Sequence, residues 1–312
     1  MAKATESAWA RFRASRWRVL LWLVPVLIVV AVGLVLLAQW LRTLPEVQAW
    51  MAQYPGEYRP TVPVAEGLPA WVGWQHFLNI FFMVLVVRSG LQVRMTRRAP
   101  GFWTRTNKGL IRTKRPPRKI SLHLWLHNAV DLLWVVNGAI FITLIFVTGH
   151  WARIIPTSWE VVPNALSALL QYASFDWPTE DGWVNYNALQ QLSYFGVVFV
   201  LAPLAIITGI RMAEFWPTEA KVNRIYPVEW ARAVHYPTML LFVLFTIVHV
   251  VLVLATGAQR NLNHMFAATN DASSWLGVIF FAVGMLVCAG AVVAAQPIVY
   301  RPIAQLFGKV SR

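Results

Sequence analysis

Six continuous apolar runs, each long enough to cross a lipid bilayer, constrain this chain more than any other feature of its sequence. A helix needs roughly 20 residues to span a hydrocarbon core of about 30 Å. Because the runs are continuous rather than alternating, they predict membrane helices and not the strands of a membrane barrel. The predicted fold is therefore an all-α integral membrane bundle of six transmembrane helices. We expect the spans near residues 19–41, 70–88, 128–150, 189–211, 235–256 and 274–296.

Composition supports this class and excludes others. Only 13% of the 312 residues are charged and 58% are hydrophobic, whereas a soluble domain carries about 25% charged residues. The single cysteine, Cys288, excludes an intramolecular disulfide, and no Cys-x-x-Cys-His motif for covalent haem attachment is present. A basic stretch from Arg11 to Arg18 precedes the first run as in a signal peptide. The apolar core that follows is too long for one, so a retained helix is predicted.

The positive charges predict how the chain lies in the membrane. The net charge is +14, and with the N-terminus inside, 23 of the 27 Lys and Arg residues fall in inner segments. Lys and Arg concentrate in cytoplasmic loops, so both termini are expected in the cytoplasm. The basic loop 88–119 lies directly between two spans. We expect it to touch anionic lipid head groups or an acidic partner rather than nucleic acid. The outer segments hold only Arg42, Arg59, Arg153 and Arg260.

Two histidines on the fifth span indicate where the chemistry lies. Ionisable side chains at membrane depth are costly and mark functional sites. His235 and His249 are 14 residues apart, which is just under four helical turns, so both rings leave nearly the same face about 21 Å apart. This spacing suits one ligand for each of two cofactors stacked across the bilayer.

Each of these histidines has a candidate partner at matching depth. His76 and His249 are expected to meet on the outer side, and His127 and His235 on the inner side. His123 lies four residues before His127, on the same helical face, and is an alternative inner ligand. His150 and His264, taken alone, are expected only to form hydrogen bonds at the membrane surface.

Pairs of histidines favour haem over zinc. Zinc takes four ligands in tetrahedral geometry, whereas a six-coordinate haem iron takes two axial imidazoles. Gly73, Gly138 and Gly196 are expected to leave space for the flat macrocycle. Asp131, four residues after His127, has three open roles: orienting a ligand histidine, accepting a proton, or pairing with a basic group.

A Ser/Thr-Gly dipeptide recurs near the ends of spans two to five. We interpret it as the glycine that commonly follows a helix C-terminus. Its four occurrences are Ser89-Gly90, Thr148-Gly149, Thr208-Gly209 and Thr256-Gly257.

The same spans resemble a known family. The stretch from Ala233-Val234-His235 through Val248-His249 resembles the last core helix of bacterial di-haem cytochrome b subunits, which serve formate dehydrogenase, thiosulfate reductase and nickel–iron hydrogenase. Trp74-Gln75-His76-Phe77-Leu78-Asn79 is similar to their first helix, with Phe77 in place of the usual Trp. Tyr186-Asn187-Ala188-Leu189-Gln190 resembles the Tyr-Asn-x-x-Gln start of their third helix. The likeness covers roughly residues 70–260.

The resemblance implies a function and a set of site residues. It implies that His76 with His249, and His127 with His235, hold two b haems, and that Asn187 and Gln190 lie beside a quinone (menaquinone or ubiquinone). The implied activity is electron transfer between quinone and a catalytic oxidoreductase, with an iron–sulfur subunit as a further partner, in the bacterial cell membrane. The additional first span turns the core over relative to the formate dehydrogenase subunit, so a retained quinone site would face outward.

Three segments and two rival functions complete the expectations. The segments are an N-terminal tail with an extra helix (1–69), a four-helix di-haem core (70–260) and an additional C-terminal helix with its tail (261–312). A transporter or proton channel is disfavoured because few prolines interrupt the spans, and Pro237 is expected in the tolerant first turn of span five. The other rival is a cofactor-free anchor for a catalytic subunit.

Overall fold

The computed structural model describes residues 16–108, 112–113, 116–177, 181–217, 219 and 221–312. Arg11 and Arg13 of the basic N-terminal stretch lie outside these residues. Six helices in the described chain are long and apolar enough to cross a membrane, which confirms the predicted all-α class with six spans. They are α2 (Leu20–Leu41), α4 (Ala70–Met95), α5 (Leu122–Val147), α7 with α8 (Ala188–Met212), α9 (Val228–Ala255) and α11 (Leu276–Ala294).

Several helices run beyond the apolar stretches that predicted them. α4 continues to Met95, and α5 begins at Leu122, where the Ser121 hydroxyl accepts a hydrogen bond from the backbone N–H of Leu124 at 3.2 Å. This N-cap satisfies a donor that the helix leaves open and so fixes its start. Because α9 begins at Val228, Pro237 lies inside the helix and not in its first turn, which corrects our expectation.

The fourth span changes its helical pitch midway. α7 (Ala188–Gly196) leads into a π-helical turn (Val197–Leu201) and then into α8 (Ala202–Met212). Pro203 lies in the first turn of α8 and brings no backbone N–H to the preceding turn. The wider π turn accommodates this missing donor while the span continues.

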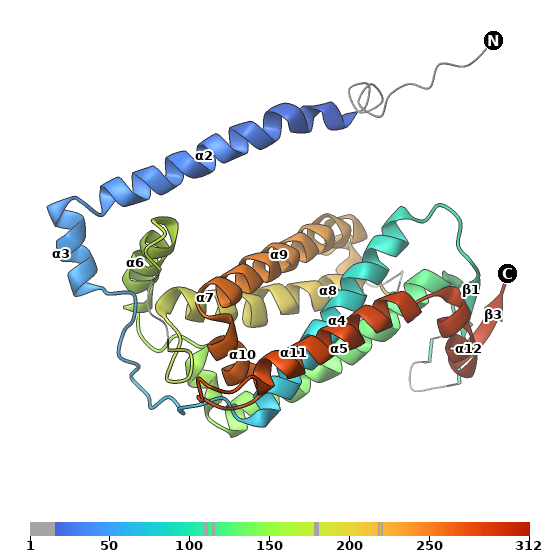
Figure 1. Cartoon of the computed structure of the whole chain (residues 1–312). Coiled ribbons are helices and arrows are strands. Elements are labelled where there is room, and N and C mark those ends of the chain that lie inside the picture. The colour runs from blue at the N-terminus through green and yellow to red at the C-terminus, as the bar shows by residue number, and fades with distance from the viewer. Residues whose placement is uncertain (1–15, 109–111, 114–115, 178–180, 218, 220) are drawn as a thin grey trace, which may run out of the picture. The chain divides into compact units, whose positions relative to one another are not determined.

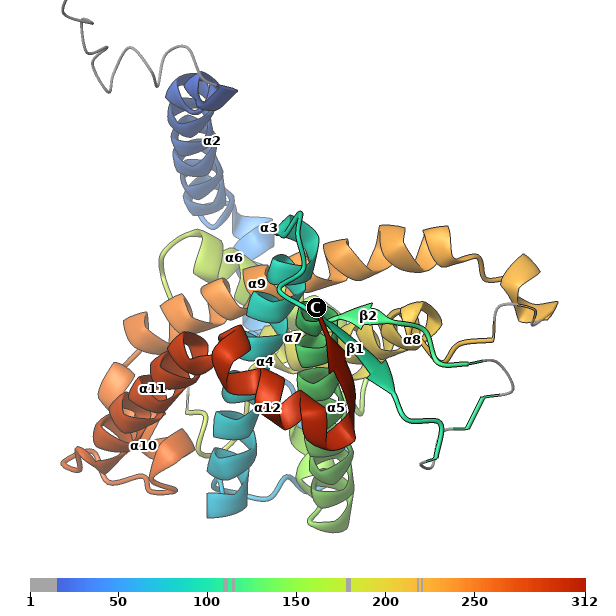
Figure 2. The same cartoon turned by 90° about the vertical axis from the view of Figure 1, so that its right-hand side faces the viewer.

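A small antiparallel sheet, which the sequence did not predict, closes one end of the larger unit (Figure 2). Its strand order is β2-β1-β3, with Phe102 opposite both Ser121 and Ser311. Trp103 packs in a buried cluster with Leu122 and Trp125, and its indole N–H donates to the Ala304 carbonyl at 3.0 Å. We call this the sheet end. The strands are β1 (Phe102–Arg105), β2 (Ile120–Ser121) and β3 (Gly308–Ser311).

The remaining helices are short. Two of them, α10 and α12, flank the sixth span, and α12 packs on the sheet end. Four-residue 3-10 helices occur at residues 16–19, 150–153 and 221–224. The short α-helices are α3 (Pro45–Gln53), α6 (Val161–Ala173), α10 (Ala258–Phe266) and α12 (Pro297–Phe307).

The described chain forms two compact units. The smaller comprises the described parts of residues 1–59, 158–180 and 187–190, and the larger comprises the described parts of residues 60–157, 181–186 and 191–312. Within the smaller unit, α2 packs on α6, and Arg42 at the end of α2 contacts Ser174 and Asp176.

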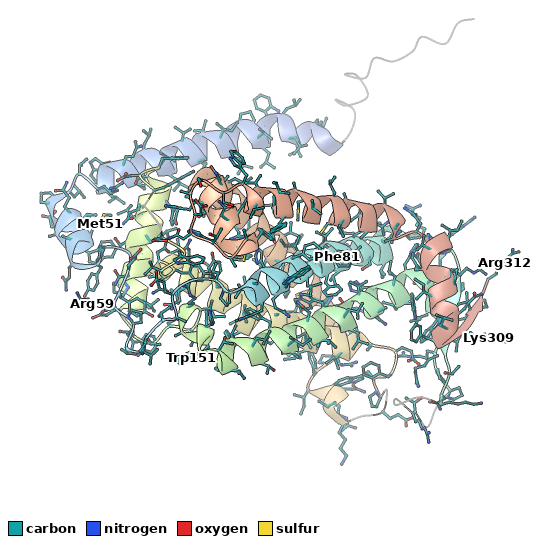
Figure 3. All side chains as sticks on the ribbon, turned by 60° about the horizontal axis from the view of Figure 1, so that its bottom comes forward. Met51, Arg59, Phe81, Trp151, Lys309 and Arg312 are labelled. Atoms are coloured by element: carbon teal, nitrogen blue, oxygen red, sulfur yellow. The ribbon has the colours of Figure 1, made fainter. Side chains whose placement is uncertain are left out.

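Within the larger unit, helices pack as two close pairs. α4 packs along α5 and α8 packs along α9, whereas close backbone contact between the two pairs is sparse (Figure 1). α11 lies against α4 and α10. Figure 3 shows Lys309 and Arg312 at the sheet end and Trp151 beyond the opposite end of α5. Side chains must therefore bridge the space between the two helix pairs.

Candidate functional site

The first histidine pair lies away from the sheet end, between α4 and α9. The ring centroids of His76 and His249 are 6.1 Å apart, with 66° between the ring planes. Aromatic rings surround the pair: Phe245 stacks on His249 at 5.6 Å, Tyr194 lies 6.0 Å from His249, and Phe266 lies 5.7 Å from His76. The sequence-predicted partners of this pair are thus brought together in an apolar surround.

The second pair lies nearer the sheet end, between α5 and α9. The ring centroids of His127 and His235 are 6.4 Å apart, and the rings are nearly perpendicular at 89°. Both sequence-predicted pairs therefore share α9. Each pair joins one helix of the α4/α5 pair to α9 of the α8/α9 pair.

Two buried hydroxyls orient the second pair. Ser89 Oγ lies 3.0 Å from His127 Nδ1, and Thr208 Oγ1 lies 2.8 Å from His235 Nδ1. Ser89 donates its own proton to the Val86 carbonyl at 3.1 Å, and Thr208 donates to the Leu204 carbonyl at 2.7 Å. A hydroxyl has one proton to donate, so each oxygen must accept from an imidazole N–H.

With the hydroxyl protons donated to these carbonyls, both rings are assigned the Nδ1-protonated tautomer. The proton is on Nδ1, which leaves the lone pair of Nε2 available to a metal ion. Histidine ligands to metals are usually held in this way, with the second ring nitrogen hydrogen-bonded to a protein group. Since both hydroxyl-bearing residues are at most 2% exposed, water does not compete for these contacts.

The glycines that follow these hydroxyls make room for the rings. A Cβ atom on Gly90 would lie 3.2 Å from Cε1 of His127, and one on Gly209 would lie 3.7 Å from Cε1 of His235. Gly90 and Gly209 lie inside α4 and α8, so their interpretation as helix-ending glycines was wrong. Gly149 (φ 77°) does follow a helix end, and so does Gly257 (φ 132°).

His123 faces a different partner. Its Nδ1 lies 2.8 Å from the hydroxyl of Tyr300 on α12, and the residue is 6% exposed. Burial raises the pKa of Tyr300 to about 12, so its hydroxyl keeps its proton at neutral pH. Of the two inner candidates, it is His127 whose ring lies opposite His235.

The separation of the paired rings fits a metal ion between them. A histidine nitrogen binds a metal ion at about 2.0 Å. Two imidazoles that bound one metal ion from opposite sides would have centroids about 6.3 Å apart, and the paired rings lie 6.1 and 6.4 Å apart. Among the described residues, no group of three or more His, Cys, Asp or Glu side chains is placed to hold a metal ion. Two imidazoles in each pair would match the number of protein ligands that a haem iron takes.

The three glycines expected to leave space behave differently. A Cβ on Gly138 or Gly196 would meet nothing within 4 Å, so both border open space. A Cβ on Gly73 would lie 2.4 Å from the Met265 carbonyl oxygen. Gly73 thus permits close approach of α4 and α10, and our expectation of open space there was wrong.

Asp131 lies beside the second pair. Its Oδ2 is 3.4 Å from Nε2 of His127, the nitrogen that an axial ligand would use. This contact fits the roles of orienting His127 or accepting a proton, and among the described residues no Lys or Arg forms an ion pair with Asp131.

Asn187 and Gln190 cap a helix. The backbone N–H of Asn187 donates to Gln190 Oε1 at 3.0 Å, and the backbone N–H of Gln190 donates to Asn187 Oδ1 at 2.9 Å. This reciprocal arrangement is a capping box at the start of α7. Asn187 Nδ2 also donates to the hydroxyl of Tyr172 at 3.0 Å. The Asn-x-x-Gln spacing is itself a sequence signal for a helix cap.

Arg153 is a buried structural residue, although its sequence position predicts only a charge on the outer side. It is 2% exposed, and its guanidinium lies 5.4 Å from the ring of Tyr186. Burial raises the pKa of Tyr186, while Arg153 acts in the opposite direction. The buried cation thus ties three stretches of chain together. It donates hydrogen bonds of 2.6 to 3.1 Å to the carbonyls of Ala65, Gly182, Trp183 and Val184.

The other two histidines bond to nearby side chains. His150 Nδ1 lies 2.9 Å from the Thr148 hydroxyl, and burial lowers its pKa. His264 Nε2 lies 2.7 Å from Asn270 Oδ1.

Comparison of the chain with protein-family models, curated proteins and solved structures finds no match. The function proposed below therefore depends on the geometry of these residues.

Proposed function

We propose that this multi-pass membrane protein is a di-haem b-type cytochrome. It would carry electrons between the quinone pool and a partner oxidoreductase of the molybdoenzyme or hydrogenase type, with an iron–sulfur subunit as a further partner. In this proposal it lies in the bacterial cell membrane with both termini in the cytoplasm. His76 and His249 would hold one haem, and His127 and His235 the other.

One observation carries the proposal. Two histidine pairs, at ring separations of 6.1 and 6.4 Å, share one helix and bridge two helix pairs that have little backbone contact. Ring separations of this size also occur elsewhere, for example 6.3 Å between His123 and Tyr300. The support therefore comes from the two His–His pairs themselves, which lie at two levels of one helix. The sequence resemblance points to the same four residues independently of the distances.

The chain's own residues supply binding and orientation. Ser89 and Thr208 would hold the Nδ1 protons of His127 and His235, and the Nε2 atoms would then be the ones that bind the iron. Phe245 and Phe266 pack against the rings of the other pair. A bound haem supplies the one-electron redox chemistry. Because α9 contributes to both sites, its rigid 14-residue spacing sets their separation.

The test is haem content and the reduced-minus-oxidised spectrum of the purified protein. The wild type should show low-spin b haem, and His249→Ala and His235→Ala should each lose about half of it, since each removes one axial ligand. In a redox titration, each variant should keep the midpoint potential of one haem and lose that of the other. The two variants should keep different haems, because they remove ligands from different sites.

Two other buried histidines provide matched controls. His264→Ala and His123→Ala remove rings that bond to Asn270 and Tyr300, so haem content should stay at the wild-type level. A wild-type protein without haem, or full haem in the His249 and His235 variants, would refute the proposal.

A further inference from the structure

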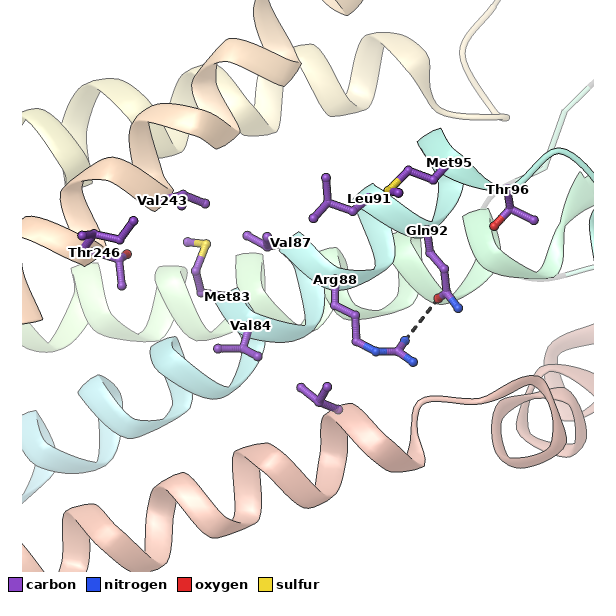
Figure 4. Close-up of a pocket in the computed structure, with 12 residues that line it drawn as sticks. Met83, Val84, Val87, Arg88, Leu91, Gln92, Met95, Thr96, Val243 and Thr246 are labelled. Carbon is purple, nitrogen blue, oxygen red and sulfur yellow. Dashed lines mark hydrogen bonds between the residues drawn. The ribbon is translucent and has the colours of Figure 1, made fainter. Parts of the chain in front are cut away.

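An apolar groove runs along α4 between α9 and α11, on the larger unit. Its volume is about 700 Å³. Met83, Val84, Val87 and Leu91 form its floor, and Val243 of α9 forms part of one wall (Figure 4). The groove is open along its side, so a chain-like molecule can enter from the surroundings of the bundle.

One charged residue lies in this apolar groove. Arg88 is half-buried seven residues before the end of α4, which is about 10 Å along the helix. Its Nη1 donates to Gln92 Oε1 at 3.2 Å, as Figure 4 shows. Within the part of the chain that the structure describes, no carboxylate forms an ion pair with it. A cation in a membrane span is costly and normally has a partner.

Arg88 does not serve the histidine pairs. It lies two residues from Gly90, which is about 200° around the helix, and Gly90 is the residue that contacts His127. The Arg88 side chain lines the groove, and its charge also acts on the neutral hydroxyl of Tyr300 on α12. Gln92 and Thr96 follow it at four-residue intervals and continue a polar stripe to the end of the helix, where exposed Arg97 and Arg98 follow.

We propose that this groove binds an anionic phospholipid. The phosphate accepts hydrogen bonds from Arg88 and Gln92, because a guanidinium matches the geometry of phosphate oxygens. An acyl chain lies along Met83, Val84 and Val87, where the groove is apolar. The uncompensated positive charge distinguishes this ligand from a neutral lipid or a quinone, which bring apolar chains without an anion. The inference does not depend on haem binding.

The test measures lipid binding to the full-length delipidated protein by native mass spectrometry in detergent. The probes are phosphatidylglycerol and phosphatidylcholine with identical acyl chains, and a menaquinone analogue. Arg88→Gln should bind phosphatidylglycerol about tenfold more weakly than the wild type, equivalent to about 1.4 kcal/mol. Its binding of phosphatidylcholine should be unchanged. The control Arg97→Gln removes the same charge from an exposed site nearby and should bind both lipids as the wild type does.

A second variant tests the groove without touching the charge. Val84→Trp fills the apolar floor beside Arg88 and should weaken phosphatidylglycerol binding at least as much, even if Arg88→Gln does not fold. Equal loss in Arg88→Gln and Arg97→Gln would overturn the proposal, because it would indicate a general charge effect. Saturable binding of the menaquinone analogue with no preference for phosphatidylglycerol would also overturn it.

Discussion

The substitution Thr208→Val tests the hydroxyl that orients His235. Valine has nearly the shape of threonine but cannot accept the Nδ1 proton, which the threonine oxygen holds at 2.8 Å. Thr238→Val is a matched control on α9. Thr238 is also 2% exposed and also donates to a carbonyl one turn back, that of Val234 at 2.9 Å. The difference between the two variants therefore isolates the contact with His235.

The expected magnitude follows from the lost hydrogen bond. A typical one contributes about 1 kcal/mol net, which corresponds to roughly 40 mV for a one-electron couple. When a ligating histidine donates a hydrogen bond from its second ring nitrogen, the ring becomes more basic and favours the oxidised metal. Without that bond, the reduction potential of the haem held by His127 and His235 should rise by up to this amount. The haem held by His76 and His249 should keep its potential.

A spectroelectrochemical titration of the purified variants measures both potentials in one experiment. The wild type and Thr238→Val should give the same pair of midpoints, and Thr208→Val should shift one of them upward. Equal shifts in Thr208→Val and Thr238→Val, or equal shifts of both haems, would show that Thr208 does not act through His235.

Two further predictions concern neighbouring residues. Gly90→Ala should lower occupancy of the haem held by His127, because the new Cβ would lie 3.2 Å from the His127 ring. The control Gly138→Ala, whose Cβ would meet nothing within 4 Å, should leave occupancy of both haems unchanged. The pyridine haemochrome assay measures both. Asn187→Asp keeps an N-cap acceptor but loses the amide that donates to Tyr172, so a fall in quinone reduction at unchanged thermal stability would support a quinone role for Asn187. Loss of stability with unchanged turnover would assign it to the helix cap alone.

The sequence predicted the six spans and the pairing of histidines because both depend on regular helical spacing. Apolar runs of span length predict helices by themselves, and His235 and His249 share a face wherever α9 lies. Depth in the membrane then selects His76 and His127 as partners, since residues at equal depth on neighbouring spans can meet. The choice of His127 over His123 needed only its distance from the span end.

Other features depend on packing between distant segments, which the spacing of residues along the chain does not predict. The sheet joins residues 102–105 to 308–311, and no local pattern links two strands so far apart. The carbonyls that hold Arg153 come from separate loops, so the residue was counted only as a charge. The start of α7 was different, because Asn187 and Gln190 have the spacing of a capping box and were interpreted through the resemblance instead.

The recurring Ser/Thr-Gly dipeptide shows why a pattern can have two structural meanings. At Thr148-Gly149 the glycine takes a positive φ after a helix end, a conformation that glycine adopts at little cost. At Ser89-Gly90 and Thr208-Gly209 the helix continues, and the missing side chain leaves room for an imidazole from the neighbouring helix. The hydroxyl one residue earlier then reaches the Nδ1 of that ring. Where the helix continues past the dipeptide, the dipeptide contacts a histidine of the site. Where the helix ends, the dipeptide only terminates the helix. The two continuing cases hold the two rings of one histidine pair, so this pair is the one whose ligand orientation the dipeptide controls.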